Sequence, residues 1–141
     1  MKAVLQFIDY HVTNIEYLYD PSFIEDEADL KPDFSFELEF ADENKEQANL
    51  QLGIELGDRN LEKNSIYVNC KVKGEFIIEA ANELDEGDKI DYYRINGVAI
   101  LYPYLRSLVS DVTGKGSEQP VILPTMNIIK MIQDQEQKAH Q

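Results

Sequence analysis

The stretch that decides the fold is NGVAILYPYLRSLVSDVTGKGSEQPVILP, residues 96–124. Its first half places apolar side chains at the three-and-four spacing of one helix face: Val98, Leu101, Leu105, Leu108 and Val112. Three further apolar side chains widen this stripe: Ile100, Tyr104 and Val109. A stripe this wide exceeds what one side of a surface helix can hide. The sequence therefore predicts that something besides the chain's own core covers this helix.

The flanking residues suggest where the helices begin and end. Pro103 suits the first turn of a helix, or a kink if Asn96 caps a helix that starts earlier. Gly114 and Gly116 predict a left-handed stop after the helix. Asn127 is expected to cap a last helix, and residues 133–141 are expected to form a frayed polar tail.

Four segments upstream have the composition of strands. Residues 3–19 predict an unusually long strand that could contain a bulge. Residues 34–40 alternate between apolar and polar side chains, as do residues 50–56 and 66–72, which is typical of an antiparallel strand with one solvated face. The polar residues 57–64 join the last two strands as a hairpin, and residues 80–94 predict a connector with one short helix. Four strands followed by segregated helices indicate an α+β fold with a single four-stranded antiparallel sheet.

Length and composition indicate one domain spanning residues 1–141. The chain has 141 residues, of which 43% are hydrophobic and 28% charged. The net charge of −14 disfavours nucleic acid and favours basic partners, including basic unfolded segments. The sequence has neither a long apolar run nor the pattern of a secretory signal, so we expect a cytoplasmic protein without membrane insertion.

The sequence offers little for catalysis. It contains no glycine-rich phosphate loop and no Gly-x-Ser-x-Gly motif, and Cys70 alternates with apolar neighbours as a small core residue would. The acidic run at residues 25–29 lacks the ligand spacing and glycine turn of a calcium loop. We therefore expect a protein that works through its surfaces, without enzymatic activity, metal or cofactor.

Residues 96–127 resemble the signature helix and following crossover of the SecB family of bacterial protein-export chaperones. The motif ILYPY at residues 100–104, with Arg106, is similar to the core of that signature, and Leu123, Pro124 and Asn127 are similar to its end. Upstream, Pro32 and residues 67–77 fit the family's strands in register. The resemblance thus covers nearly the whole chain and is strongest over its last third.

The resemblance implies a four-stranded sheet with a long helix and a terminal helix, assembled as a dimer of dimers. It also implies a chaperone that holds unfolded polypeptides, such as precursors for export, in apolar grooves without nucleotide or cofactor. In such a homotetramer the long helices pack against one another, which would explain the wide apolar stripe.

The chain departs from the family at the positions that dock on the translocase motor. These positions fall on Asn14, Leu18, Asn69 and Lys71, none of which is acidic. Glu16 and Asp20 would supply an anionic patch only after a shift in register. The departure raises an alternative, since some family members resemble chaperones of a toxin–antitoxin pair that bind the antitoxin.

These arguments lead to two sets of site residues. The oligomer interface is expected on one helix face, at Val98, Leu101, Leu105 and Leu108. The same stripe could instead pack on the chain's own sheet, and periodicity alone does not separate these alternatives. Client contacts are expected on apolar side chains of the crossover and the terminal helix, where core packing is the alternative for the helix residues: Phe23, Ile24, Leu30, Ile128, Met131 and Ile132.

Overall fold

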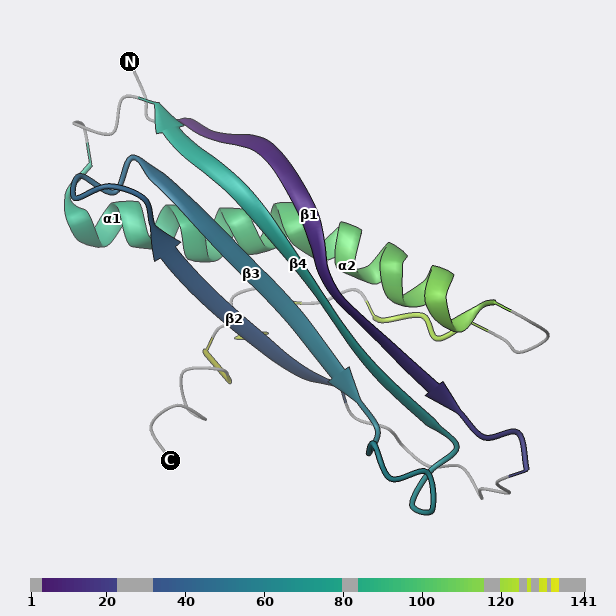
Figure 1. Cartoon of the computed structure of the whole chain (residues 1–141). Coiled ribbons are helices and arrows are strands. Elements are labelled where there is room, and N and C mark those ends of the chain that lie inside the picture. The colour runs from purple at the N-terminus through teal and green to yellow at the C-terminus, as the bar shows by residue number, and fades with distance from the viewer. Residues whose placement is uncertain are drawn as a thin grey trace.

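The computed structural model describes residues 4–22, 32–79, 84–115, 120–124, 127, 130–131 and 133–134. It contains a four-stranded antiparallel sheet with a long helix across one face (Figure 1). The strands are β1 (Val4–Tyr19), β2 (Asp33–Phe40), β3 (Gln47–Leu56) and β4 (Ile66–Glu79), in the spatial order β1-β4-β3-β2. The predicted strands and the α+β fold class are confirmed.

Strand β1 contains two irregularities in its pairing with β4. The register shifts between Phe7 and Asp9 and again between Val12 and Asn14, so that Ile8 and Thr13 have no direct partner. Each bulge changes the phase of the alternation by one residue. The sequence suggested one bulge in this long strand, and the structure contains two.

The short helix expected within residues 80–94 is present, and it runs without a break into the long helix, which the sequence predicted from Asn96. Helix α1 (Glu86–Asp91), the π-helix η2 (Tyr92–Gly97) and helix α2 (Val98–Thr113) follow one another directly. Asp85 is the N-cap, and its side chain accepts a hydrogen bond from the backbone N–H of Asp88 at 2.7 Å. Asn96 therefore caps nothing and lies inside the π-helix.

The middle and the end of this segment also differ from expectation. Pro103 lies in the interior of α2 and not in its first turn. Gly114, the C-cap, has a φ of −84° and is right-handed, so the predicted left-handed stop is wrong at this residue. Gly116 lies outside the described residues.

Helix α2 packs closely on the centre of the sheet. Its inward face buries apolar side chains against β3 and β4, including Val98, Leu101, Leu105 and Val109. Gly74 permits the approach, because a Cβ there would lie 2.8 Å from the Cδ2 of Leu101. A larger residue at this position would push the helix away from the strand.

The segment after α2 is tied back to that helix by side chains of the signature motif. Arg106 Nε donates a hydrogen bond to the carbonyl oxygen of Leu123, and the hydroxyl of Tyr102 donates one to the carbonyl oxygen of Pro124. The Oδ1 of Asn127 accepts a hydrogen bond from the N–H of Lys130 at 3.1 Å, so Asn127 caps the last helix as predicted. In the part of the chain that is described, no helix has the length and apolar character needed to cross a membrane.

Candidate binding surfaces

Both edges of the sheet are formed by strands that carry incompletely buried apolar side chains. Within the described part of the chain, β1 pairs only with β4 and β2 only with β3. An edge strand exposes backbone N–H and C=O groups that can pair with another chain. The two edges therefore position two candidate surfaces, one at the β1 edge beside α2 and one at the β2 edge.

The first surface, which we call the β1–α2 surface, combines the helix-facing side of β1 with the outward flank of α2. Because of the two bulges, Tyr10, Val12 and Ile15 all face the helix side of the sheet, opposite Gly74, Val72 and Cys70 of β4. The helix does not cover them, and Ile15 is 52% exposed. On α2, Tyr104 is exposed and Leu108 half-buried. The surface thus consists of Tyr10, Val12, Ile15, Tyr104 and Leu108.

A groove runs along this surface, and aromatic contacts define one of its ends. Its volume is about 260 Å³, and besides residues of the surface it is lined by Ser107 and Asp111. The ring centroids of Tyr10 and Tyr104 are 4.4 Å apart, and Phe7 lies 5.6 Å from Tyr104. Aromatic pairs at these separations attract each other beyond simple burial, so these contacts help to hold β1 against α2.

The predicted interface residues divide between the core and the surface. Val98, Leu101 and Leu105 are completely buried within the chain, where they belong to the core on the sheet. Their side chains therefore have no surface left to contact a second chain. Of the two alternatives that the sequence left open, these three residues follow the second, packing on the chain's own sheet. Leu108 is half-buried and lines the groove.

The second surface, the β2 edge, presents a row of half-buried apolar side chains. Phe34, Phe36, Leu38 and Phe40 face the helix side of the sheet, and their partial burial alternates with exposed residues along the strand. Phe34 packs edge-on against Tyr102, and Phe40 packs edge-on against Tyr93. The row therefore continues the core to the rim of the sheet, where part of each side chain is still in contact with solvent.

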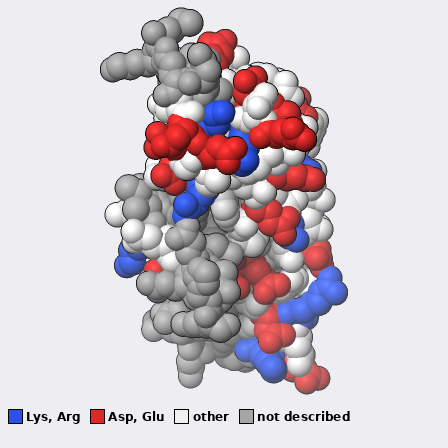
Figure 2. Space-filling view, turned by 90° about the vertical axis from the view of Figure 1, so that its left-hand side faces the viewer, with Lys and Arg blue, Asp and Glu red and all other residues white. Residues whose placement is uncertain are grey.

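Acidic groups surround the β2 edge. Glu37 and Glu39 point to the opposite, open face of the sheet, and Glu86 and Asp88 lie in the first turn of α1. Figure 2 looks at the molecule from this side and shows acidic side chains gathered over its upper part, with few basic ones among them. Lys73 pairs with Glu39 and Lys45 with Glu86, so lysines offset part of this charge, and the remaining acidic groups favour cationic groups on a partner.

Most of the predicted client-contacting residues lie outside the described residues: Phe23, Ile24, Leu30, Ile128 and Ile132. Met131 is described, and only 5% of its surface is exposed, because it packs into the core. These crossover residues lie in the chain between β1 and β2, so both edge strands adjoin them in sequence, and Leu30 is nearest to β2.

The open face of the sheet carries Asn14, Leu18, Asn69 and Lys71, the four positions that the sequence resemblance compared with a docking site. Asn14 pairs with Lys71 and its amide donates a hydrogen bond to the carbonyl oxygen of Asn69, while Leu18 pairs with Tyr67. Glu16 forms an ion pair with Arg59. Asp20 accepts hydrogen bonds from Ser22, which hold the pKa of its carboxyl below the usual range. Glu16 is therefore paired with a cation, whereas Asp20 keeps its negative charge, because its partner Ser22 is neutral.

The ionisable groups of the core are poor candidates for chemistry. Burial raises the pKa of the Cys70 thiol to about 11, which keeps it protonated and unreactive at neutral pH. Burial also raises the pKa of Tyr93, whose hydroxyl donates a hydrogen bond to the carbonyl oxygen of Lys45 at 2.8 Å. Within the described ranges, no group of three or more metal-ligating side chains comes together.

Sequence reasoning missed Tyr10, Val12 and Ile15 as surface residues. Their spacing of two and then three residues is the signal of a bulge between Val12 and Ile15. It cannot be interpreted without knowing the partner strand, since only the pairing shows which residue is extra.

Known proteins are similar in sequence to this chain. The profile of the family described as preprotein translocase subunit SecB matches residues 13–139. An uncharacterised protein of Methanocaldococcus jannaschii is 33% identical over 138 residues, which cover 93% of this chain and 84% of that protein.

Two solved structures are similar to this fold. The SecB-like chaperone Rv1957 of Mycobacterium tuberculosis, in complex with a ChAD peptide from the HigA1 antitoxin, has a TM-score of 0.64 and 19% identity, covering 87% of this chain and 90% of that chain. A protein of unknown function from Streptococcus agalactiae has a TM-score of 0.48 and 15% identity, covering 89% of this chain and all of that one.

Proposed function

This chain belongs to the SecB family, and we propose that it is an ATP-independent chaperone that holds unfolded polypeptides, with precursors of exported proteins as its clients. The observation that carries the proposal is the β2 edge. Among the described residues β2 pairs with β3 alone, and its outer edge coincides with a row of half-buried apolar side chains, so an extended client can pair with the backbone while its own apolar residues contact Phe34, Phe36 and Leu38.

Such a site recognises clients by features that most unfolded chains share, not by a particular sequence. Backbone pairing is available to any extended segment, and apolar burial of about 25 cal/mol per Å² rewards any aromatic or aliphatic side chain. Folded proteins hide both features. The predicted contacts at Phe23, Ile24 and Leu30 would extend this surface toward the crossover, and those at Ile128, Met131 and Ile132 would extend it toward the terminal helix, with Met131 available only if that helix moves.

The negative potential around the β2 edge adds a preference among clients. Basic unfolded segments are attracted to Glu37, Glu39 and the acidic turn of α1, which accelerates their capture. Salt screens such attraction beyond about 10 Å at 0.1 M. Capture of a basic client is therefore expected to slow as salt is added, while the apolar holding step is not weakened.

Suppression of aggregation tests the chaperone activity. Chemically unfolded client proteins of unrelated sequence are diluted into buffer with the full chain and without ATP, and light scattering is recorded. Scattering should fall for several clients at about stoichiometric amounts of the chain. If no unfolded client is protected, the holdase proposal fails.

We also propose that the chain assembles as a homotetramer, a dimer of dimers, through the β1–α2 surface. This surface exposes Tyr10, Val12 and Ile15 next to Tyr104 and Leu108, and contiguous exposed apolar side chains of this kind are typical of subunit contacts. The stripe predicted for the interface thus contributes through Leu108, while Val98, Leu101 and Leu105 would support the contact from the core.

The second candidate is a chaperone of a toxin–antitoxin system, which would bind an aggregation-prone segment of its antitoxin. Two observations favour it. The docking positions Asn14, Leu18, Asn69 and Lys71 include no acidic side chain, and the similar structure of Rv1957 holds an antitoxin peptide. Proteins co-purifying with the chain from its own cells separate the candidates, since export predicts precursors and the translocase motor, whereas the alternative predicts a toxin and its antitoxin.

A further inference from the structure

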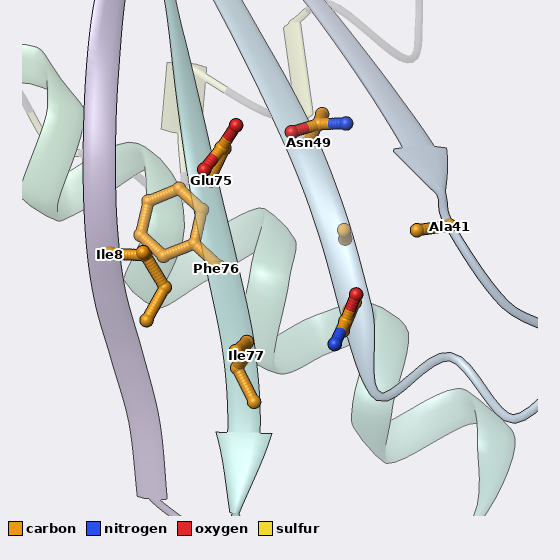
Figure 3. A pocket seen from close by; sticks show the side chains of 8 residues that line it. Ile8, Ala41, Asn49, Glu75, Phe76 and Ile77 are labelled. Carbon is orange, nitrogen blue, oxygen red and sulfur yellow. The ribbon is translucent and has the colours of Figure 1, made fainter.

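A hollow on the open face of the sheet lies apart from both binding surfaces. It has a volume of about 220 Å³ and is formed where β1, β4, β3 and the turn after β2 meet. Figure 3 shows Ile8 on β1 beside Phe76 and Ile77 on β4, with Asn49 across on β3 and Ala41 at the far side. The hollow is large enough for one aliphatic side chain.

The first bulge of β1 creates the apolar wall of this hollow. Ile8 is the extra residue of that bulge, without a direct partner on β4, and it is 51% exposed. Bulges often redirect a side chain that regular alternation would place elsewhere. Here the bulge puts an exposed isoleucine next to the half-buried Ile77 on a face that is otherwise mostly polar.

The same bulge brings two carboxylates opposite each other at the rim. Asp9 and Glu75 are direct partners in the register of β1 and β4. Both are exposed, and like charges in directly opposed positions destabilise a sheet. Among the described residues neither forms an ion pair with a lysine or arginine. The Oδ1 of Asp9 accepts a hydrogen bond from the backbone N–H of Tyr10 at 2.8 Å, and the Nε2 of His11 lies 3.9 Å from its Oδ2.

We propose that this hollow is a docking site for a partner protein's peptide segment in which an aliphatic side chain adjoins a lysine or arginine. The aliphatic side chain fills the space between Ile8 and Ile77, and the cation lies between Asp9 and Glu75. Charge complementarity favours this occupant, because a cation there relieves the repulsion of the two carboxylates and an acidic segment would increase it. The site is independent of client holding at the β2 edge.

Isoleucine methyl resonances of the full chain test the proposal, because Ile8 and Ile77 are themselves reporters. The probe is a synthetic peptide with two Leu-Lys pairs in a serine and glycine background. The methyl resonances of Ile8 and Ile77 should shift on titration, while those of Ile15 and Ile122, on other surfaces, should not. Peptides with Leu-Glu or Ser-Lys pairs should produce no saturable shift.

Matched variants measure how much the carboxylate of Glu75 and the apolar side chain of Ile8 contribute to peptide binding. Glu75→Gln should weaken binding of the Leu-Lys peptide about fivefold, the upper range for one exposed ion pair, whereas Glu62→Gln should change it less than twofold. Both positions are exposed, so the two variants remove the same charge, and Glu62 lies in the β3–β4 connection, at the other end of this strand pair from the hollow. Ile8→Ser should abolish binding, and Ile122→Ser, which alters a residue that is 64% exposed, should not.

Glu75→Gln also has an effect that a merely structural role would not produce. Without peptide, its melting temperature should equal or exceed that of the unmodified chain, because one of the opposed charges is removed. Equal weakening by Glu75→Gln and Glu62→Gln would show general attraction to an acidic protein and overturn the proposal. Shifts of Ile8 and Ile77 caused by Mg²⁺ or Ca²⁺ alone, or by increasing concentration of the chain itself, would also overturn it.

Discussion

Arg106 Nε lies 2.7 Å from the carbonyl oxygen of Leu123 and donates a hydrogen bond to it. Leu123 is 2% exposed, so water cannot readily replace this donor. Arg106→Ala should lower the free energy of unfolding by about 1 to 3 kcal/mol, the cost of an unsatisfied buried carbonyl. Denaturant unfolding at fixed protein concentration measures the change.

Lys115→Ala is the control for this variant. Lys115 lies just past the end of α2, and its ion pair with Asp111 is at the surface, so its removal should change the free energy of unfolding by less than about 0.5 kcal/mol. If both variants are equally stable, the contact of Arg106 with Leu123 does not support the fold.

The assembly should depend on exposed residues of β1. Ile15→Glu places a charge in the β1–α2 surface, and burying that charge between subunits is unfavourable. Sedimentation velocity at micromolar concentration should therefore show a species smaller than the tetramer. Ile122→Glu, in the segment after α2, should sediment as the unmodified chain does. A tetramer that persists in Ile15→Glu would contradict an interface at this surface.

Client holding should depend on the crossover that precedes β2. Replacing Phe23 and Leu30 together with serine should weaken suppression of client aggregation, because two of the proposed apolar contacts with the client are lost. The melting temperature should change little. The result is read from light scattering and thermal unfolding of the same preparation, and undiminished holding would reject these positions as client contacts.

Stability should fall in alkaline solution. In the unfolded chain the Cys70 thiol ionises near its ordinary pKa of 9, whereas burial raises the pKa to about 11 in the folded chain. Between these values the unfolded state binds fewer protons, so the free energy of unfolding decreases as pH rises, by about 2 to 3 kcal/mol over the interval at 1.36 kcal/mol per pKa unit.

Cys70→Ala tests the assignment of this pH dependence. Unfolding of both chains in denaturant at pH 8 and pH 10.5 should show a smaller loss for the variant. Some loss remains expected, because burial also raises the pKa values of Tyr93 and Tyr102. An identical loss in both chains would mean that Cys70 does not contribute.

Much of this architecture can be inferred from local patterns. The alternation of residues 34–40 and the polar connection at residues 57–64 predict strands and a hairpin that the structure contains. The cap at Asn127 depends only on a side chain and the next turn of backbone. Such features are decided within a few residues, so they are visible in the sequence.

The start of the long helix was harder to infer. Residues 80–94 lack a clear apolar period, yet Asp85 caps a helix there, and the turn after β2 packs on it through Tyr93 and Lys45. A contact between residues 48 positions apart stabilises a helix that local sequence only weakly favours. Residues 80–83 lie outside the described part of the chain.

The sequence by itself determined which side chains of α2 share a face, because the helical period is a property of the backbone. Only the tertiary structure decided that Val98, Leu101 and Leu105 are covered by the chain's own sheet, while Tyr104 and Leu108 remain available to other molecules. The same holds for β1, where two bulges set the direction of each side chain through the pairing with β4. The physical reason is that periodicity defines a face, whereas burial depends on what packs against that face from distant parts of the chain.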